Sequence, residues 1–280
     1  MTPPLRSVLF LPASNARAIE KARGLACDAV VLDLEDAVGP DEKDAGREAA
    51  IEAVRAGGFR AATVAVRVNE VGSPWGEADL AAVCDAGPDA VVAPKVGSAQ
   101  VLRAYDGALC AAPERVRLWA MIETSSALLN LREIAGAGGR LQALLFGGND
   151  MSKDLRRAVS ANRTALHPGM AWTVAAARAN GLIPVDAVFN VIEDPSGLEA
   201  ECREGRDFGF DGKSLIHPSQ IETCNRVFSP SDAEIAWARA VVSAFADPAN
   251  AGKGVVRAGG QMAERLHLEQ AERVLALAGA

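Results

Sequence analysis

The chain has 280 residues, of which 49% are hydrophobic and 23% are charged, and these are the proportions of an ordinary globular protein. Lysine and arginine number 29 and aspartate and glutamate number 36, so the net charge is −7, and no block of like charge stands out. This balance argues against a nucleic-acid partner or an anionic membrane surface. No uninterrupted apolar run of about 18 residues occurs, so the sequence predicts no transmembrane helix.

The five cysteines never occur as a Cys-x-x-Cys pair. We interpret them as reduced thiols that pack as small apolar groups, as is usual in a cytoplasmic protein. The apolar run near the N-terminus, Val8–Leu11, is bounded by Pro12 and is too short for a signal peptide. We therefore expect a cytoplasmic location.

Eight short apolar runs, rich in β-branched residues, recur along the chain and predict β-strands. In chain order they are Ser7–Leu11, Ala29–Leu32, Thr63–Val68, Ala90–Ala93, Leu118–Ile122, Ala143–Phe146, Pro184–Phe189 and Gly212–Ile216. The stretches between them have the spacing of amphipathic helices. Ser196 with Glu199, and Ser231 with Glu234, have the spacing of capping boxes and predict the starts of two later helices.

Regular alternation of strands and helices implies parallel strands that are joined by right-handed crossovers. Eight such units favour a closed (β/α)8 TIM barrel, a fold of about 250 residues. An open doubly wound sheet would show the same alternation, but no Gly-x-Gly-x-x-Gly segment follows any predicted strand. The sequence therefore predicts an α/β protein of the barrel type.

The tail after the eighth unit is expected to be a separate extension. Ser231–Phe245 has the pattern of a long amphipathic helix, and Leu266–Leu277 predicts a last helix. Between them, Asp247–Gly260 is rich in Gly, Ala and Pro and predicts a loop or hinge. We therefore expect a barrel over residues 1–228 and a helical extension over 229–280, which caps the barrel mouth as a lid or contacts another subunit.

In a barrel of this kind the chemistry lies at the carboxyl ends of the strands. Most predicted strands are followed by ionisable or amide side chains, among them Asn15, Asp33, Glu35, Asp36, Asn69, Asn149, Asp150, Asn190 and His217. Helix caps also favour Asp and Asn, so some of these are expected to be structural only. Caps do not explain Arg67, Lys95 or Glu123, whose burial requires a partner or a ligand. A barrel held by internal ion pairs is the alternative interpretation.

The ends of the fifth and sixth predicted strands form a candidate metal site. The three histidines, His167, His217 and His267, are widely spaced, so a zinc site is not expected. The carboxylates of Glu123 and Asp150 instead suit a hard, oxygen-binding ion, Mg²⁺ or Mn²⁺. Two carboxylates leave coordination positions open for water and for a chelating substrate.

Seven short motifs follow one another along nearly the whole chain: Arg6–Pro12, Val31–Val38, Arg67–Asn69, Pro94–Lys95, Ile122–Thr124, Phe146–Asp150 and Gly209–Pro218. Together they resemble the citrate lyase beta subunit-like family of the HpcH/HpaI aldolase and citrate lyase superfamily, which includes citramalyl-CoA and malyl-CoA lyases. The resemblance implies a TIM barrel, Mg²⁺ dependence and homo-oligomers such as trimers or hexamers. It also implies cleavage or formation of a carbon–carbon bond next to an acyl thioester, usually acyl-CoA.

The resemblance assigns roles to the residues around the candidate metal site. Glu123 and Asp150 match the family's metal-binding carboxylates, and Glu123 is also expected to contact the substrate. Arg67 matches the arginine that holds a carboxylate or carbonyl oxygen of the substrate. Glu35 and Asp36 are expected to position metal-bound water or Arg67, and a plain ion-pair role is the alternative.

The resemblance also implies contacts with CoA. Phe10, Arg17 and Lys21 fall where the family contacts CoA, and Ser214 and Leu215 fall in its second thioester-binding segment. Arg17 and Lys21 are four residues apart, so on a helix they share one face and could meet phosphates. A solvated basic face is the alternative for that pair.

The tail carries the candidate acid–base residue. The family usually has Gly-x-Met-x-Asp there, with an aspartate that often reaches the site of a neighbouring subunit, whereas Gly260–Glu264 reads Gly-Gln-Met-Ala-Glu. Glutamate keeps the carboxylate but adds a methylene, so an acid–base role and an exposed structural role are both open for Glu264. The segments Pro12–Ser14 and Leu166–Gly169 also differ from the family's usual sequences, and these differences bear on which acyl group is bound and not on the metal site.

The function expected from these residues is that of a Mg²⁺-dependent carbon–carbon lyase. It would split a 3-hydroxyacyl thioester such as malyl-CoA or citramalyl-CoA into an acyl-CoA and a 2-oxo acid, with Arg67 stabilising oxyanion charge and Glu264 moving protons. Three alternatives stay open. They are a thioester hydrolase of the same family, a metal-independent Schiff-base aldolase that uses Lys95 or Lys213, and a family member that binds CoA esters without turnover.

Overall fold

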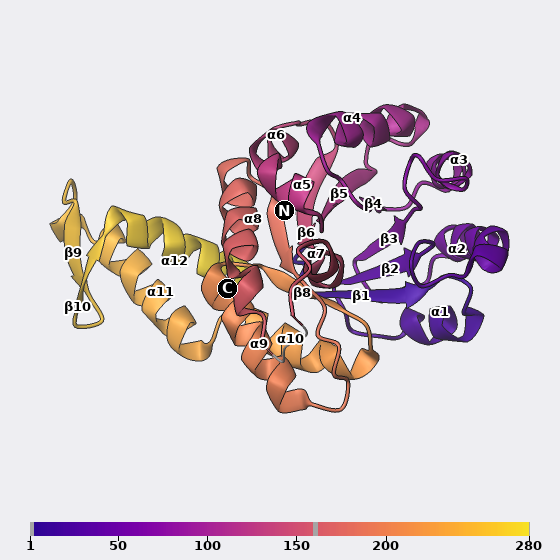
Figure 1. The fold of residues 1–280 in the computed structure, drawn as a ribbon. Helices are drawn as coiled ribbons and strands as arrows, with labels where there is room; N and C mark the ends of the chain where they lie inside the picture. Colours follow the sequence, from indigo (N-terminus) through magenta and orange to yellow (C-terminus); the bar gives the residue numbers. More distant parts are fainter. Residues whose placement is uncertain (1–2, 159–161, 280) are drawn as a thin grey trace. The chain divides into compact units, whose positions relative to one another are not determined.

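The structure is a computed structural model that describes residues 3–158 and 162–279. The chain forms two compact units, residues 1–225 and 226–280. In the first unit, eight parallel strands close into a barrel in chain order, and helices surround it (Figure 1). The predicted (β/α)8 TIM barrel is therefore confirmed. The role of the tail as a lid stays a prediction.

All eight predicted strands are present. They are β1 (Ser7–Pro12), β2 (Ala29–Asp33), β3 (Thr63–Arg67), β4 (Ala90–Ala93), β5 (Arg117–Ile122), β6 (Leu141–Phe146), β7 (Ile183–Asp186) and β8 (Gly212–Leu215). The helices of this unit are α1 (Ala16–Arg23), α2 (Lys43–Ala56), α3 (Gly76–Ala86), α4 (Ala99–Ala108), α5 (Ser125–Leu129), α6 (Leu131–Ala135), α7 (Gly148–Asp154), α8 (His167–Ala179), α9 (Pro195–Phe208) and α10 (Ile221–Phe228), which crosses the boundary between the units. β7 is shorter than its predicted run, because the N–H of Ala187 donates to the Asp186 carboxylate at 2.8 Å instead of extending the ladder.

Every second strand residue fills the interior of the barrel. The interior cluster consists of Leu5, Val8, Ala29, Val31, Ala65, Ala90, Val92, Trp119, Met121, Ala143, Leu145 and Val185. One further step of this alternation along β2, β3 and β5 reaches Asp33, Arg67 and Glu123. The polar side chains at the mouth of the barrel are therefore the outermost layer of its interior.

The side chains of Asp186 and Lys213 point away from the barrel interior and face the surrounding helices. The two are register partners, and the Lys213 Nζ lies 3.0 Å from Asp186 Oδ2 and 2.6 Å from Glu201 Oε1. The Arg163 guanidinium lies 2.8 Å from the same Asp186 carboxylate. Asp186 and Lys213 are both fully buried, so this cluster joins β7, β8 and α9 by ion pairs in a dry environment.

The second unit has its own core. It contains α11 (Asp232–Ala246), the antiparallel hairpin of β9 (Val255–Ala258) and β10 (Gln261–Glu264), and α12 (Arg265–Ala278). The predicted loop over Asp247–Gly260 is wrong in its second half, which forms β9. Gly259 and Gly260, at the turn, have φ of 54° and 84°, which glycine adopts without strain, so the glycines mark a hairpin and not a hinge.

The two predicted capping boxes have different outcomes. Ser231 and Glu234 form theirs, with the N–H of Ser231 donating to Glu234 Oε2 at 2.7 Å. The box of Ser196 and Glu199 is wrong, because α9 starts earlier, at Pro195. Asp194 is its N-cap and accepts from the N–H of Gly197 at 2.9 Å, and proline is favoured at the first helical position.

The cysteines are free thiols, and Cys27, Cys202 and Cys224 are buried as small apolar groups, whereas Cys110 is exposed. The sulfur atoms of Cys202 and Cys224 lie 3.4 Å apart between α9 and α10. Within residues 3–158 and 162–279, no helix combines the length and the apolar character that crossing a membrane requires.

Candidate functional site

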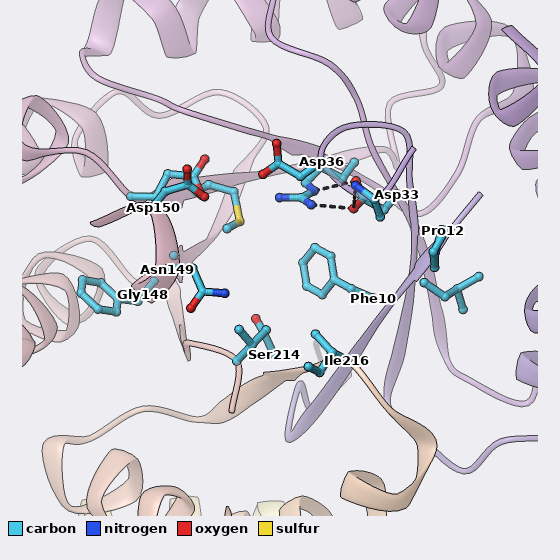
Figure 2. Close-up of a pocket in the computed structure, with 17 residues that line it drawn as sticks. Phe10, Pro12, Asp33, Asp36, Gly148, Asn149, Asp150, Ser214 and Ile216 are labelled. Atoms are coloured by element: carbon cyan, nitrogen blue, oxygen red, sulfur yellow. Dashed lines mark hydrogen bonds and ion pairs between the residues drawn. The ribbon is translucent and has the colours of Figure 1, made fainter. Parts of the chain in front are cut away.

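A cavity of about 400 Å³ lies at the carboxyl ends of the barrel strands. Its polar lining includes Asp33, Asp36, Arg67, Glu123, Asp150 and Ser214. Figure 2 shows Asp33, with its bonds to the guanidinium, and Asp150 on opposite sides of the cavity. The cavity therefore combines the guanidinium of Arg67 with several carboxylates.

Asp33 holds the Arg67 guanidinium at one wall. Arg67 Nε and Nη2 donate to the two oxygens of Asp33 at 2.7 and 2.5 Å, and the register of β2 and β3 places the two residues opposite each other. Arg67 Nη1 also lies 2.9 Å from Glu35 Oε2, an ion pair without hydrogen-bond alignment. Burial alone lowers the pKa of Arg67, but the charges of Asp33 and Glu35 raise it, so the guanidinium stays charged. The Phe10 ring lies 5.4 Å from its central carbon.

Glu35 and Asp36 have different places although they are neighbours in sequence. Glu35 is buried outside the cavity lining, between Arg67 and the Nζ of Lys95, which donates to its Oε1 at 2.5 Å. The Asp36 side chain lines the cavity and is 54% exposed. The buried ammonium of Lys43 donates to the backbone carbonyls of Leu34 and Glu35, each at 2.7 Å, and so holds the backbone at this point.

Glu123 is a nearly fully buried carboxylate of the cavity, like Asp33. It is 1% exposed, and its Oε1 accepts a hydrogen bond from the N–H of Lys95 at 2.7 Å. A Cβ at Gly147 would lie 2.5 Å from Glu123 Cβ and Oε2, and a Cβ at Gly148 would lie 2.9 Å from Ala187 Cβ. Only glycines fit this closely packed wall.

The surroundings of Glu123 fit a divalent cation. Burial, and then the charge of Glu35, raise the pKa of Glu123 to about 8, and Asp150 is close enough to add to this effect. A cation between the two carboxylates would relieve the repulsion, and carboxylate oxygens suit Mg²⁺. The part of the chain that the structure describes holds no cluster of three or more His, Cys, Asp or Glu side chains suited to a metal, and Glu123 and Asp150 are two carboxylates that line the same cavity.

We expect cation binding to depend steeply on pH. Because the pKa of Glu123 is about 8 without a metal, protons compete with the cation at lower pH. The affinity for Mn²⁺ should fall about tenfold for each unit of pH from about 8 to 6. The dissociation constant at each pH is measured by titrating the protein with Mn²⁺ and following the electron paramagnetic resonance signal of the free ion. The control is Glu123→Gln, which should bind weakly at every pH, and a constant wild-type affinity would contradict the expectation.

The residues predicted to contact CoA lie on β1, α1 and β8. Phe10 and Ser214 line the cavity, and the buried Ser214 hydroxyl has no hydrogen-bond partner within the described residues. Arg17 and Lys21 are exposed on α1, which follows β1 directly. Leu215 is fully buried and does not line the cavity. The structure thus brings Ser214 and Phe10 together, and the CoA contacts stay predictions.

The two lysines considered for a Schiff base are both held as ammonium groups. Burial lowers the pKa of Lys213, but the charges of Asp186 and Glu201 outweigh this effect and raise it. For Lys95, the hydrogen bond to Glu35 and the charges of Glu35 and Asp36 raise the pKa in the same way against burial. A Schiff base needs a neutral amine, so the environment of both lysines argues against the aldolase alternative.

Glu264 lies in the second unit, where it ends β10 and directly precedes α12. Its backbone N–H donates to His267 Nδ1 at 2.9 Å, and its side chain is exposed. The two residues form a capping box in which the Glu264 side chain accepts from the backbone N–H of His267 at the start of α12. The acid–base role of Glu264 stays a prediction.

Sequence analysis missed the role of Asp33. Asp33 ends the second strand, whereas the expected functional residues of this segment were its neighbours Glu35 and Asp36. The signal was present in the alternation, because Asp33 follows the inward-facing Val31 by two residues and Arg67 follows Ala65 in the same way.

Comparisons with known proteins agree with the fold. Residues 6–218 match the HpcH/HpaI aldolase/citrate lyase family. A (3S)-malyl-CoA thioesterase of Cereibacter sphaeroides (strain KD131) is 45% identical over 277 residues, which cover 99% of this chain and 95% of the relative. An L-malyl-CoA/beta-methylmalyl-CoA lyase of Rhodobacter capsulatus is 31% identical, and the match covers 96% of this chain and 93% of the relative. The crystal structure of CitE from Mycobacterium tuberculosis in complex with magnesium, acetoacetate and coenzyme A is 30% identical, with a TM-score of 0.80 and coverage of 99% and 98%. The chain therefore belongs to the HpcH/HpaI aldolase/citrate lyase family, as its motifs predicted.

Proposed function

We propose that the protein is a Mg²⁺-dependent enzyme that hydrolyses the thioester of a malyl-type acyl-CoA and releases free CoA. The observation that carries this proposal is one cavity that is lined both by a fixed guanidinium and by a pair of carboxylates suited to a cation. That combination fits a short acyl group with both a carboxylate and a hydroxyl. The 45% identity to a malyl-CoA thioesterase supports hydrolysis, and the magnesium and CoA of the CitE complex support the cofactor and the thioester.

Each side of the cavity has a role in binding. Arg67 binds the free carboxylate of the acyl group, because Asp33 and Glu35 hold its guanidinium in one orientation. Glu123 and Asp150 would hold Mg²⁺, which supplies a Lewis acid for a chelating hydroxy acid when bound. The unpaired hydroxyl of Ser214 donates to the thioester carbonyl oxygen. Leaving such a group unpaired costs about 1–3 kcal/mol, which the substrate contact offsets.

Hydrolysis also requires a group that takes a proton from water. Asp33 and Glu35 are engaged with Arg67, whereas Asp36 lines the cavity and is open to solvent. We assign to the Asp36 carboxylate the orientation of the attacking water and the acceptance of its proton. Glu264 is assigned the return of a proton to the departing sulfur, from the tail of a neighbouring subunit in a homo-oligomer.

Carbon–carbon cleavage of the same substrate class is the second candidate function. The L-malyl-CoA/beta-methylmalyl-CoA lyase relative matches over 96% of this chain, and Arg67 with the two carboxylates would stabilise an oxyanion in that reaction as well. The motifs alone predicted the lyase first. The higher identity to the thioesterase favours hydrolysis.

Incubation with Mg²⁺ and (3S)-malyl-CoA distinguishes the two functions. Hydrolysis gives malate and free CoA, which a thiol reagent detects, whereas cleavage gives glyoxylate and an intact acetyl thioester. We expect free thiol in equal amount to malate, no glyoxylate, and loss of activity in EDTA that Mg²⁺ restores. Glyoxylate without free thiol would establish the lyase instead. No conversion of malyl-, methylmalyl- or citramalyl-CoA would contradict both.

Glu264→Gln tests the role of the tail. Glutamine is nearly the same size but cannot transfer a proton, so kcat should fall about 100-fold while KM and the melting temperature stay close to wild type. Glu269→Gln, an exposed change on α12, which follows Glu264 directly, is the matched control. A wild-type kcat for Glu264→Gln would remove the residue from the mechanism.

A further inference from the structure

Lys95 has a backbone conformation that is unusual for a lysine. Its φ is 50°, and among the described non-glycine residues only Arg156 also has a positive φ. Side chains with a Cβ meet steric strain in this left-handed region. Strained residues of this kind persist where the surrounding structure holds them, often beside a functional site.

Three contacts hold Lys95 in this conformation, and all are to carboxylates. Its backbone N–H donates to Glu123 Oε1 at 2.7 Å. Its Nζ donates to Glu35 Oε1 at 2.5 Å and lies 3.8 Å from Asp36 Oδ1. The side chain is thus anchored at the segment that follows β2, while the backbone N–H points to Glu123 at the end of β5. The ion pair with Glu35 offsets the strain, which explains how a lysine occupies a position that glycine would adopt freely.

The N–H contact determines which oxygen of Glu123 is available. Within the described residues, Oε1 is the oxygen that accepts a hydrogen bond. Oε2 lies beside Gly147, which lines the cavity and leaves no room for a Cβ on that side. Since Glu123 is almost fully buried, the Lys95 N–H and the Gly147 backbone together fix the plane of its carboxylate.

We propose that Lys95 is a positioning residue for the cation site. Its left-handed backbone presents the N–H to Glu123 Oε1 and so leaves Oε2 directed at the cavity, where it ligates the cation. The ammonium acts as the tether that maintains this backbone, and it does not contact the substrate. The inference rests on the proposed function only in taking Glu123 as a cation ligand.

Three substitutions separate the backbone from the ammonium. Lys95→Gly removes the ammonium and adopts a positive φ without strain, so it keeps the N–H in place. Lys95→Val also removes the ammonium, but a β-branched residue resists this conformation. Lys95→Ala removes the ammonium as well, and alanine resists a positive φ more than glycine does but less than valine. The readout is the dissociation constant of Mn²⁺ without substrate, from the paramagnetic resonance signal of the free ion, with the melting temperature recorded for each variant.

We expect Lys95→Gly to bind Mn²⁺ within about threefold of wild type, and Lys95→Val to bind it at least about tenfold more weakly, with Lys95→Ala between them. If Lys95→Gly and Lys95→Val bind Mn²⁺ with equal affinity, whether unchanged or equally weakened, the positioning role is overturned. If Lys95→Val does not fold, Lys95→Ala takes its place. Equal Mn²⁺ affinities of Lys95→Ala and Lys95→Gly would then overturn the positioning role.

The measurement is independent of the proposed reaction because no substrate is present. If wild type binds Mn²⁺ and the Gly and Val variants differ as expected, the positioning role stands even where malyl-CoA is not hydrolysed. Glu123→Gln is the reference. If it binds Mn²⁺ as tightly as wild type, Glu123 is not a ligand, and the inference fails whatever reaction the enzyme performs.

Discussion

Glu123→Gln is expected to abolish Mg²⁺-dependent turnover and to leave the fold at least as stable as wild type. Loss of one of two carboxylate ligands removes several kcal/mol of charge stabilisation, so kcat should fall by about 10³-fold or more. Because burial raises the pKa of Glu123 to about 8, its ionisation destabilises the metal-free fold as the pH rises through that value. Glutamine carries no charge, so at high pH without Mg²⁺ its melting temperature should match or exceed that of wild type.

The two halves of this expectation are measured separately. The first is kcat at saturating Mg²⁺, and the second is thermal unfolding in EDTA at about pH 8.5. Asp150→Asn should lose turnover in the same way. The matched control is Asp154→Asn on the same helix, α7, since the Asp154 carboxylate accepts from the N–H of Ser125 and does not line the cavity. Full activity of either Glu123→Gln or Asp150→Asn would refute the metal site.

Arg67→Leu is expected to have the largest effect on stability. The substitution leaves the carboxylates of Asp33 and Glu35 buried without the guanidinium, at 1% and 5% exposure. Removing one partner of a buried ion pair costs about 3–5 kcal/mol, and chemical denaturation should show a loss of that size. Arg55→Leu is the control, because its pair with Asp85 has side chains that are 58% and 72% exposed, and it should cost less than about 1 kcal/mol.

A double variant separates stability from substrate binding. Replacing Asp33 as well, in Arg67→Leu/Asp33→Leu, removes one stranded carboxylate and should recover part of the lost free energy of unfolding. Activity should stay below about one hundredth of wild type, because the anchor for the substrate carboxylate is still absent. Activity that returned together with stability would show that Arg67 serves the fold alone.

The fold was predictable because the strand signals are local. Eight runs of β-branched residues recur with helices between them, and each run is found as a strand. The positions of Arg67, Glu123 and Asp150 followed from the rule that strand ends meet at one face of a barrel. Continuing the alternation inside each strand would also have identified Asp33 as the partner of Arg67.

Other features depend on contacts that are distant in sequence. Lys213 was considered as a nucleophile because its pairing with Asp186 and Glu201 exists only once β7, β8 and α9 are packed together. The left-handed backbone of Lys95 has no local signal, since glycine or asparagine is the residue that normally marks it. In the tail, Gly259 and Gly260 indicated a break, but whether a hinge or a hairpin follows is decided by the pairing of β9 with β10.

The closely packed glycine wall has a consequence for anyone who wishes to change the preferred acyl chain. A methyl group at Gly147 would displace Glu123, and one at Gly148 would meet Ala187, so a mutant library that samples these two positions would contain mostly inactive clones. Phe10, Val188 and Ile216 also line the cavity and are not part of that wall. Variation at these three positions is the route by which substrate range could broaden, in the laboratory or in evolution, while ion binding is preserved.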